Sequence, residues 1–244
     1  SAGLLSGVGG LLGGVVKLVG GTTQLLGSTV NGLTSGLNLG NPLFPEFGDT
    51  TSTPVTLGQV ADAIDADSLQ RRGIDGRGVD VAVIDTGAVP VAGLDGDAVV
   101  GGPDLSFDRQ SGVADGLDGY GHGTHLSGII AARGDASHRG IAPGARILNM
   151  KVGSADGSVD VSQVIASIDW VVAHRHDDGL NVRVINLAYG TDGAQAATLD
   201  PLAHAVESAW RNGIVVVVAA GNSGAALTNP ATDPFVLTVG GVDL

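Results

Sequence analysis

The feature that most restricts the fold of this chain is an alternation of short apolar runs with helical patterns. The runs are residues 79–84, 146–152, 182–187 and 214–220. Because they are apolar on both faces, they suit buried parallel strands better than half-exposed antiparallel ones. Apolar residues at helical spacing lie between the runs, at 161–172 and 199–210. The alternation predicts an α/β fold with a parallel sheet and right-handed crossovers.

A change in composition divides the chain near residue 54. Of the 41 glycines, many fall in the first forty residues, where Lys17 is the one charged side chain. Residues 41–54 are rich in Pro, Thr and Asp and are typical of a linker. We therefore predict a glycine-rich apolar extension with its linker at 1–54 and one folded domain at 55–244.

Three interpretations of the glycine-rich segment, residues 1–40, are open. It is a peripherally packed extension, a surface for self-assembly or for a partner helix, or a means of membrane association. Glycine pairs four residues apart, such as Gly9 and Gly13, favour close helix packing. Lys17 and the polar residues 22–24 count against a membrane-spanning helix.

The charge balance and the lack of cysteine exclude several kinds of function. The chain has 25 acidic and 12 basic residues, a formal net charge of −13. Such a chain repels phosphate backbones, so we predict no nucleic-acid partner. Without cysteine there is no disulfide framework, no thiolate nucleophile and no cysteine-based zinc site.

Three polar residues stand at positions suited to acyl-transfer chemistry. Asp85 follows the run at 79–84, His122 stands among glycines where a helix begins, and Asn222 follows the run at 214–220. An imidazole acts as a general base when a carboxylate fixes its tautomer, and an amide can donate to an oxyanion. The competing interpretations are a turn aspartate for Asp85 and a left-handed turn for Asn222. His125 is expected to be a hydrogen-bonded structural histidine, because no third metal ligand follows it and His122 at a convincing spacing.

The motifs around these residues resemble those of the subtilisin-like serine proteases, the subtilases. The matching segments are Asp85-Thr86-Gly87, His122-Gly123-Thr124-His125 and Ala219-Ala220-Gly221-Asn222, in that family's order. Residues 140–145, 151–158 and 184–190 also resemble family segments, and the likeness runs from about Leu57 to the end. It implies a subtilisin-like doubly wound, mostly parallel sheet with helices on both faces, incomplete at the C-terminus.

The resemblance also implies roles for individual residues. Asp85 would orient His122, which would act as general base and then general acid, and Asn222 would stabilise the oxyanion. Two edges would clamp an extended polypeptide substrate, one at Gly157 and Ser158, the other at Ala188, Tyr189 and Gly190. Calcium is common in the family, but no ligand loop matches here, so we predict neither metal nor cofactor.

The chain departs from the family at the nucleophile. Subtilases take it from a Gly-Thr-Ser-Met-Ala type segment, which this sequence lacks, and Ser127 and Ser223 are not plausible substitutes. The chain alone is therefore predicted to be inactive. We expect it to be either the Asp/His portion of a secreted endopeptidase whose serine lies elsewhere, in cis or on a second chain, or a silent scaffold or assembly module. An ending just after a core strand favours the first interpretation.

Overall fold

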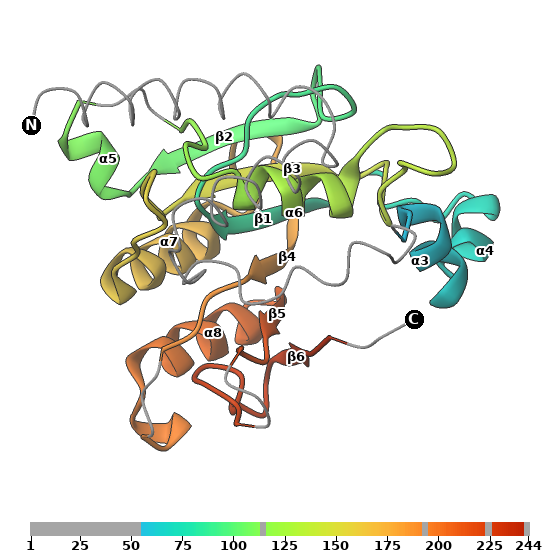
Figure 1. The fold of residues 1–244 in the computed structure, drawn as a ribbon. Helices are drawn as coiled ribbons and strands as arrows, with labels where there is room; N and C mark the ends of the chain where they lie inside the picture. The colour runs from blue at the N-terminus through green and yellow to red at the C-terminus, as the bar shows by residue number, and fades with distance from the viewer. Residues whose placement is uncertain (1–54, 113–115, 192–194, 223–225, 242–244) are drawn as a thin grey trace, which may run out of the picture. The chain divides into compact units, whose positions relative to one another are not determined.

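A computed structural model describes residues 55–112, 116–191, 195–222 and 226–241. Among these residues, six strands form one sheet in the order β2-β3-β1-β4-β5-β6, and each neighbouring pair is parallel (Figure 1). The strands are β1 (Asp80–Asp85), β2 (Val99–Asp104), β3 (Arg146–Lys151), β4 (Val182–Leu187), β5 (Val215–Ala219) and β6 (Leu237–Val239). The predicted extension at 1–54 lies outside the described residues.

The helices of the described chain differ in length and place. The longer ones are α6 (His122–Ala131), α7 (Val161–His174) and α8 (Pro201–Arg211), and the shorter ones are α3 (Leu57–Ala63), α4 (Ala66–Arg71) and α5 (Phe107–Gln110). Two short 3-10 helices, η1 and η2, cover Asp177–Gly179 and Ala197–Leu199. None of the described helices is both long and apolar enough to cross a membrane.

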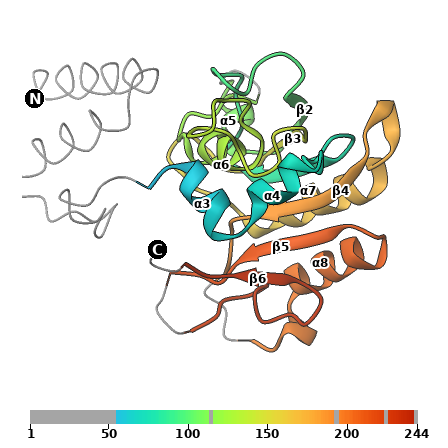
Figure 2. The same ribbon diagram turned by 90° about the vertical axis from the view of Figure 1, so that its right-hand side faces the viewer.

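Side chains of the central strand β1 point alternately into two apolar cores. Ala82 and Ile84 pack in the core that α7 and α8 close on one face. Val81 and Val83 pack with Ala131 of α6 in a smaller core on the other face. This two-residue period places helices on both sides of the sheet, and Figure 2 shows α8 alongside β5. The α/β architecture expected from the sequence is confirmed.

The structure differs from the expected elements at several boundaries. Asp85 is the last residue of β1 instead of the first residue after it. The pattern at 199–210 breaks at both ends, because Leu199 lies in η2 with 73% exposure and Trp210 is 41% exposed. Strand β2 was not expected, since Gly101, Gly102 and Pro103 interrupt any apolar run there. Helices α3 and α4 were also not expected.

The order of the strands makes β1 the point where the chain changes direction across the sheet. After β1 the chain forms β2 and β3 on one side, and it then crosses β1 to form β4 on the other. Helix α6 precedes β3 and α7 follows it, on opposite faces. In open parallel sheets, ligands bind outside the carboxyl ends of the strands at such a switch point. A ligand-binding or catalytic site is therefore expected at the carboxyl end of β1.

Candidate active site

Asp85 lies at the carboxyl end of β1, and its side chain is buried. Oδ1 accepts a hydrogen bond from the main-chain N–H of Thr86 at 2.7 Å and lies 2.7 Å from Nδ1 of His122. The main-chain carbonyl of Asp85 accepts from the N–H groups of Val152 and Gly153, which follow β3. A buried carboxylate needs polar partners of this kind to offset its desolvation. The turn after β1 is thus held by β3 as well as by its own hydrogen bonds.

His122 is the first residue of α6, and its side chain is 44% exposed. An ionised carboxylate can only accept, so the short contact with Asp85 assigns the hydrogen to Nδ1 and leaves Nε2 of the neutral ring as an acceptor. The hydrogen bond that His122 donates to Asp85 raises the pKa of His122 above its ordinary value. Partial burial opposes that rise, and the negative charges of Asp85 and Asp118 add to it. The imidazolium form is therefore stabilised where a general base must hold a proton.

Helix α6 approaches the turn after β1 so closely that glycine is required on both sides. A Cβ atom on Gly123 would lie 2.1 Å from the carbonyl oxygen of Gly87. Gly87 has a positive φ of +123°, and a Cβ there would lie 3.1 Å from the main chain of Asp118. Side chains at either glycine would push His122 away from Asp85. The close approach of the helix to the turn therefore explains why glycine stands at both positions.

Asn222 follows the carboxyl end of β5, on the same side of the sheet as the carboxyl end of β1. It comes three residues after the end of β5, follows Gly221 at a φ of +103°, and is exposed. Since β5 and β1 are parallel with β4 between them, their carboxyl ends share an edge and lie on the order of 10 Å apart. Asp85 and His122 are thus in direct contact, whereas the role expected for Asn222 stays a prediction.

The first expected substrate edge is a tight turn after β3. The main-chain N–H of Gly157 donates to the carbonyl of Ser154, and the N–H of Ser154 donates to the carbonyl of Ser158, both at 2.9 Å. The N–H of Ser158 donates to the carboxylate of Asp156. The turn therefore uses the N–H of Gly157 and both main-chain groups of Ser158 internally. A Cβ atom on Gly157 would lie 2.9 Å from the ring of Tyr120, so this edge also packs against the segment that leads to His122.

The second expected edge follows β4, the other neighbour of β1. Ala188 and Tyr189 are half-buried, and Gly190 is exposed. A Cβ atom on Gly190 would lie 2.5 Å from Oγ1 of Thr228, which again requires glycine. Because β3 and β4 flank β1, the two edges lie on either side of the turn that carries Asp85. Their binding role stays a prediction.

Two charged residues around the turn were not singled out from the sequence. Lys151, at the end of β3, is 1% exposed, and its Nζ donates to the carbonyls of Thr86 (2.8 Å) and Gly153 (2.6 Å). The same Nζ lies 3.1 Å from the carboxylate of Asp108. The second residue is Asp118, in the loop before α6. A lysine inside an apolar strand was the one available signal, since a buried lysine needs a partner.

The remaining site expectations concern metals and a second histidine. Among the described residues, no three or more side chains of His, Cys, Asp or Glu are grouped so that they could hold a metal ion. Calcium also binds main-chain and amide oxygens, so the expected lack of a metal stays a prediction. His125 is exposed on α6, which does not fit the structural histidine expected there.

Comparison with known proteins assigns this arrangement to a family. The protein-family model described as "Subtilase family" matches residues 76–244 of the sequence. This chain belongs to the subtilase family. The sheet with its change of direction at β1 and the Asp85–His122 contact all lie within the matched residues. The membership in the subtilase family that the sequence motifs implied is therefore confirmed.

Three curated relatives give the scale of the subtilase likeness. Serine protease AprX of Bacillus subtilis (strain 168) is 34% identical over 198 residues, 77% of this chain and 44% of that protein. Subtilisin DY of Bacillus licheniformis is 38% identical over 187 residues, 74% and 62% respectively. Minor extracellular protease Epr of Bacillus subtilis (strain 168) is 33% identical over 155 residues, 63% and 21%. This subtilase chain spans less than two thirds of each relative.

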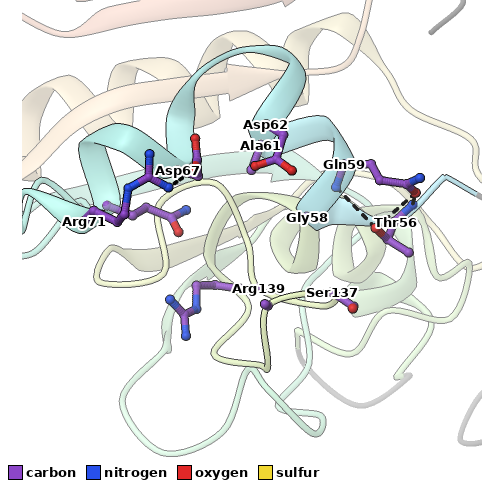
Figure 3. Close-up of a pocket in the computed structure, with 11 residues that line it drawn as sticks. Thr56, Gly58, Gln59, Ala61, Asp62, Asp67, Arg71, Ser137 and Arg139 are labelled. Carbon is purple, nitrogen blue, oxygen red and sulfur yellow. Dashed lines mark hydrogen bonds and ion pairs between the residues drawn. The ribbon is translucent and has the colours of Figure 1, made fainter.

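A cavity elsewhere in the subtilase chain is not part of this site. It has a volume of about 470 Å³ and is lined by α3, α4 and residues 136–139 (Figure 3). Four of its polar side chains are paired, Arg71 with Asp67 and Thr56 with Gln59. None of the predicted site residues lines it. The chemistry of the chain is therefore sought at the end of β1.

Proposed function

We propose that this chain carries the base and the oxyanion-binding part of a secreted serine endopeptidase, with the nucleophilic serine outside these residues. The observation that carries the proposal is the 2.7 Å contact between Oδ1 of Asp85 and Nδ1 of His122 at the switch point of the sheet. Membership in the subtilase family supports a serine protease. The sequence itself contains no Gly-Thr-Ser segment.

In the proposed reaction His122 moves one proton. Nε2 takes it from the serine hydroxyl as that oxygen attacks the carbonyl carbon of the peptide, and then gives it to the leaving amine. Asp85 keeps the hydrogen on Nδ1 and stabilises the imidazolium that forms between the two steps. The side-chain amide of Asn222 donates to the oxyanion of the tetrahedral intermediate.

The proposed substrate is an extended polypeptide that lies across the end of β1. It lies against Gly157 and Ser158 on one side and pairs with Ala188, Tyr189 and Gly190 on the other. Because much of the first edge is bonded internally, we expect most main-chain pairing on the second edge. Neither metal nor other cofactor takes part in the proposed mechanism.

The serine is proposed to reach the site from a further part of the protein, on this chain or on a second one. Support comes from β6, at one edge of the described sheet, where Leu237 and Val239 are 53% and 55% exposed. An edge strand presents unpaired main-chain groups on which another strand can form. Secretion is proposed because one relative is named an extracellular protease.

The deciding experiment begins with the sequence of the native protein beyond Leu244, read from its gene and by mass spectrometry. A Gly-Thr-Ser segment there, with fluorophosphonate labelling that His122→Ala abolishes, is the expected result. Labelling that survives His122→Ala would contradict the assigned base. The chain of 244 residues alone should not be labelled. The matched control for His122→Ala is Asp135→Asn, which changes an exposed carboxylate bonded to His138.

A second function is favoured by one observation, the lack of a Gly-Thr-Ser segment in this sequence. In that case the α/β unit is a silent scaffold or assembly module, and the glycine-rich residues 1–40 pack against partners. A stop codon directly after Leu244, with no second chain that brings a serine, would support this alternative over the protease. Deletion of residues 1–40 should then change assembly without unfolding the domain.

A further inference from the structure

Asp118 joins two segments that carry the candidate site. It lies in the loop before α6, four residues before His122. Its Oδ1 accepts from the hydroxyl of Thr86 at 2.8 Å and from the main-chain N–H of Gly121 at 2.6 Å. Its Oδ2 accepts from the N–H of Thr124 at 2.8 Å. One carboxylate therefore holds both the turn after β1 and the first turn of α6.

The hydroxyl of Thr86 completes the connection. It accepts a hydrogen bond from the N–H of Gly123 at 3.0 Å and has one hydrogen to donate. Two carboxylate oxygens compete for that hydrogen, Oδ1 of Asp118 at 2.8 Å and Oδ1 of Asp85 at 3.2 Å. The shorter contact assigns it to Asp118, so Oδ1 of Asp85 remains available to accept from His122.

We propose that Asp118 is a positioning residue for the Asp85–His122 pair. It fixes the start of α6 against the turn after β1, and it draws the Thr86 hydroxyl away from Asp85. The inference deepens the proposed function, since it concerns the geometry of the same base. Asp118 acts through Thr86 and the helix and makes no contact with the reacting atoms in this account.

The charges around His122 agree with this role. The charged groups that act on the ring are Asp85 from β1 and Asp118 from the preceding loop, and both raise the pKa of His122. Lys151 of β3 lies behind the turn, where its Nζ donates to the carbonyl of Thr86, and His125 is exposed on the same helix as His122. Loss of the charge at 118 should therefore lower the pKa of His122.

Nuclear magnetic resonance of the His122 imidazole tests the proposal in the protein of 244 residues. In Asp118→Asn we expect the titration midpoint of His122 to move to lower pH, and its Nδ1–H to exchange with solvent several-fold faster. Asp135→Asn removes an exposed carboxylate elsewhere, and it should leave both readouts of His122 unchanged. A residue that only stabilised the helix would alter the melting temperature without these changes.

A second pair of variants separates position from charge. Thr86→Val removes the bridging hydroxyl but keeps the charge at Asp118, whereas Thr86→Ser keeps both. We expect several-fold faster Nδ1–H exchange at His122 in Thr86→Val and wild-type exchange in Thr86→Ser, a comparison that decides the matter if Asp118→Asn does not fold. Unchanged exchange in Thr86→Val would overturn the proposal. Neither readout requires hydrolysis, so a failure of the proposed protease function would be seen separately.

Discussion

The three longest described helices begin in two different ways. Helices α7 and α8 are capped by the residue directly before them: Asp160 accepts from the N–H of Ser162, and Asp200 accepts from those of Leu202 and Ala203. Helix α6 begins after Gly121, which has a φ of +95° and no side chain to offer. Its first N–H groups are satisfied by Asp118 and by Thr86 instead.

The difference separates a helix start that is satisfied locally from one that depends on the turn carrying Asp85. A local cap satisfies the helix whatever the rest of the chain does. The start of α6 is satisfied only when the turn after β1 is in place, because Thr86 belongs to that turn. The helix that carries His122 and the strand that carries Asp85 are thus stabilised together.

The largest effect is expected at the contact between Asp85 and His122. Asp85→Asn keeps the shape of the side chain but can no longer hold the hydrogen on Nδ1 of His122. If the proposed serine completes the site, kcat for peptide hydrolysis is expected to fall by about 10⁴-fold. Steady-state kinetics on a peptide substrate measure this. A loss of less than tenfold would remove Asp85 from the proposed mechanism.

The next effect concerns the other side of the same turn. Lys151→Ala leaves the carbonyls of Thr86 and Gly153 without their donor and Asp108 without its cation. Breaking such a buried pair should lower the free energy of unfolding by about 3–5 kcal/mol. Arg211→Ala, which breaks the exposed pair with Glu207, is the control and should cost at most about 1 kcal/mol. Equal losses in urea denaturation would contradict the role given to burial.

Two glycines of α6 provide a comparison within one helix. A Cβ atom at Gly123 would lie 2.1 Å from the carbonyl oxygen of Gly87, whereas one at Gly128 would meet nothing within 4 Å. We expect Gly123→Ala to destabilise the fold by about 1–3 kcal/mol, because the helix must move away from the turn. Gly128→Ala should stabilise it by up to about 1 kcal/mol. Thermal unfolding of the two variants gives the sign of each effect.

A local cap should behave differently from the cap on α6. Asp160→Ala removes the side chain that begins α7 and should cost about 1 kcal/mol of unfolding free energy. Because α7 does not share its cap with the turn after β1, the titration of His122 should stay at its wild-type midpoint. A shift of that midpoint in Asp160→Ala would show that both kinds of helix start are coupled to the site.

The contrast between local and long-range contacts also explains which elements and site residues could be predicted from the sequence. Strand β4 has the bounds expected from its apolar run, so near neighbours in the sequence were enough for this strand. The pairing of Asp85 with His122 was also expected, but from family motifs rather than from spacing. Their contact spans 37 positions, a separation that local patterns do not encode.

The residues that were missed act over long separations. Lys151 is bonded to Thr86, which lies 65 positions earlier, and Asp118 is bonded to the same residue across 32 positions. The apolar strand around Lys151 indicates that this lysine needs a partner but not which one, and nothing near Asp118 indicates a partner. Strand β2 was missed for another reason. Gly101 and Gly102 interrupt its apolar run, and the strand is defined by its pairing with β3.

The smallest effect is a pH dependence with opposite signs for stability and activity. The pKa of His122 is raised in the folded protein, chiefly by Asp85. The pair therefore stabilises the fold fully below the unfolded pKa of about 6.5, and this stabilisation is lost as the pH rises through the folded pKa. The difference in unfolding free energy between wild type and His122→Gln should shrink across that window, because other titrating groups cancel between the two proteins. Hydrolysis should rise over the same window, because the base must be neutral to accept a proton. A stability difference that grew with pH would contradict the pairing on which the site depends.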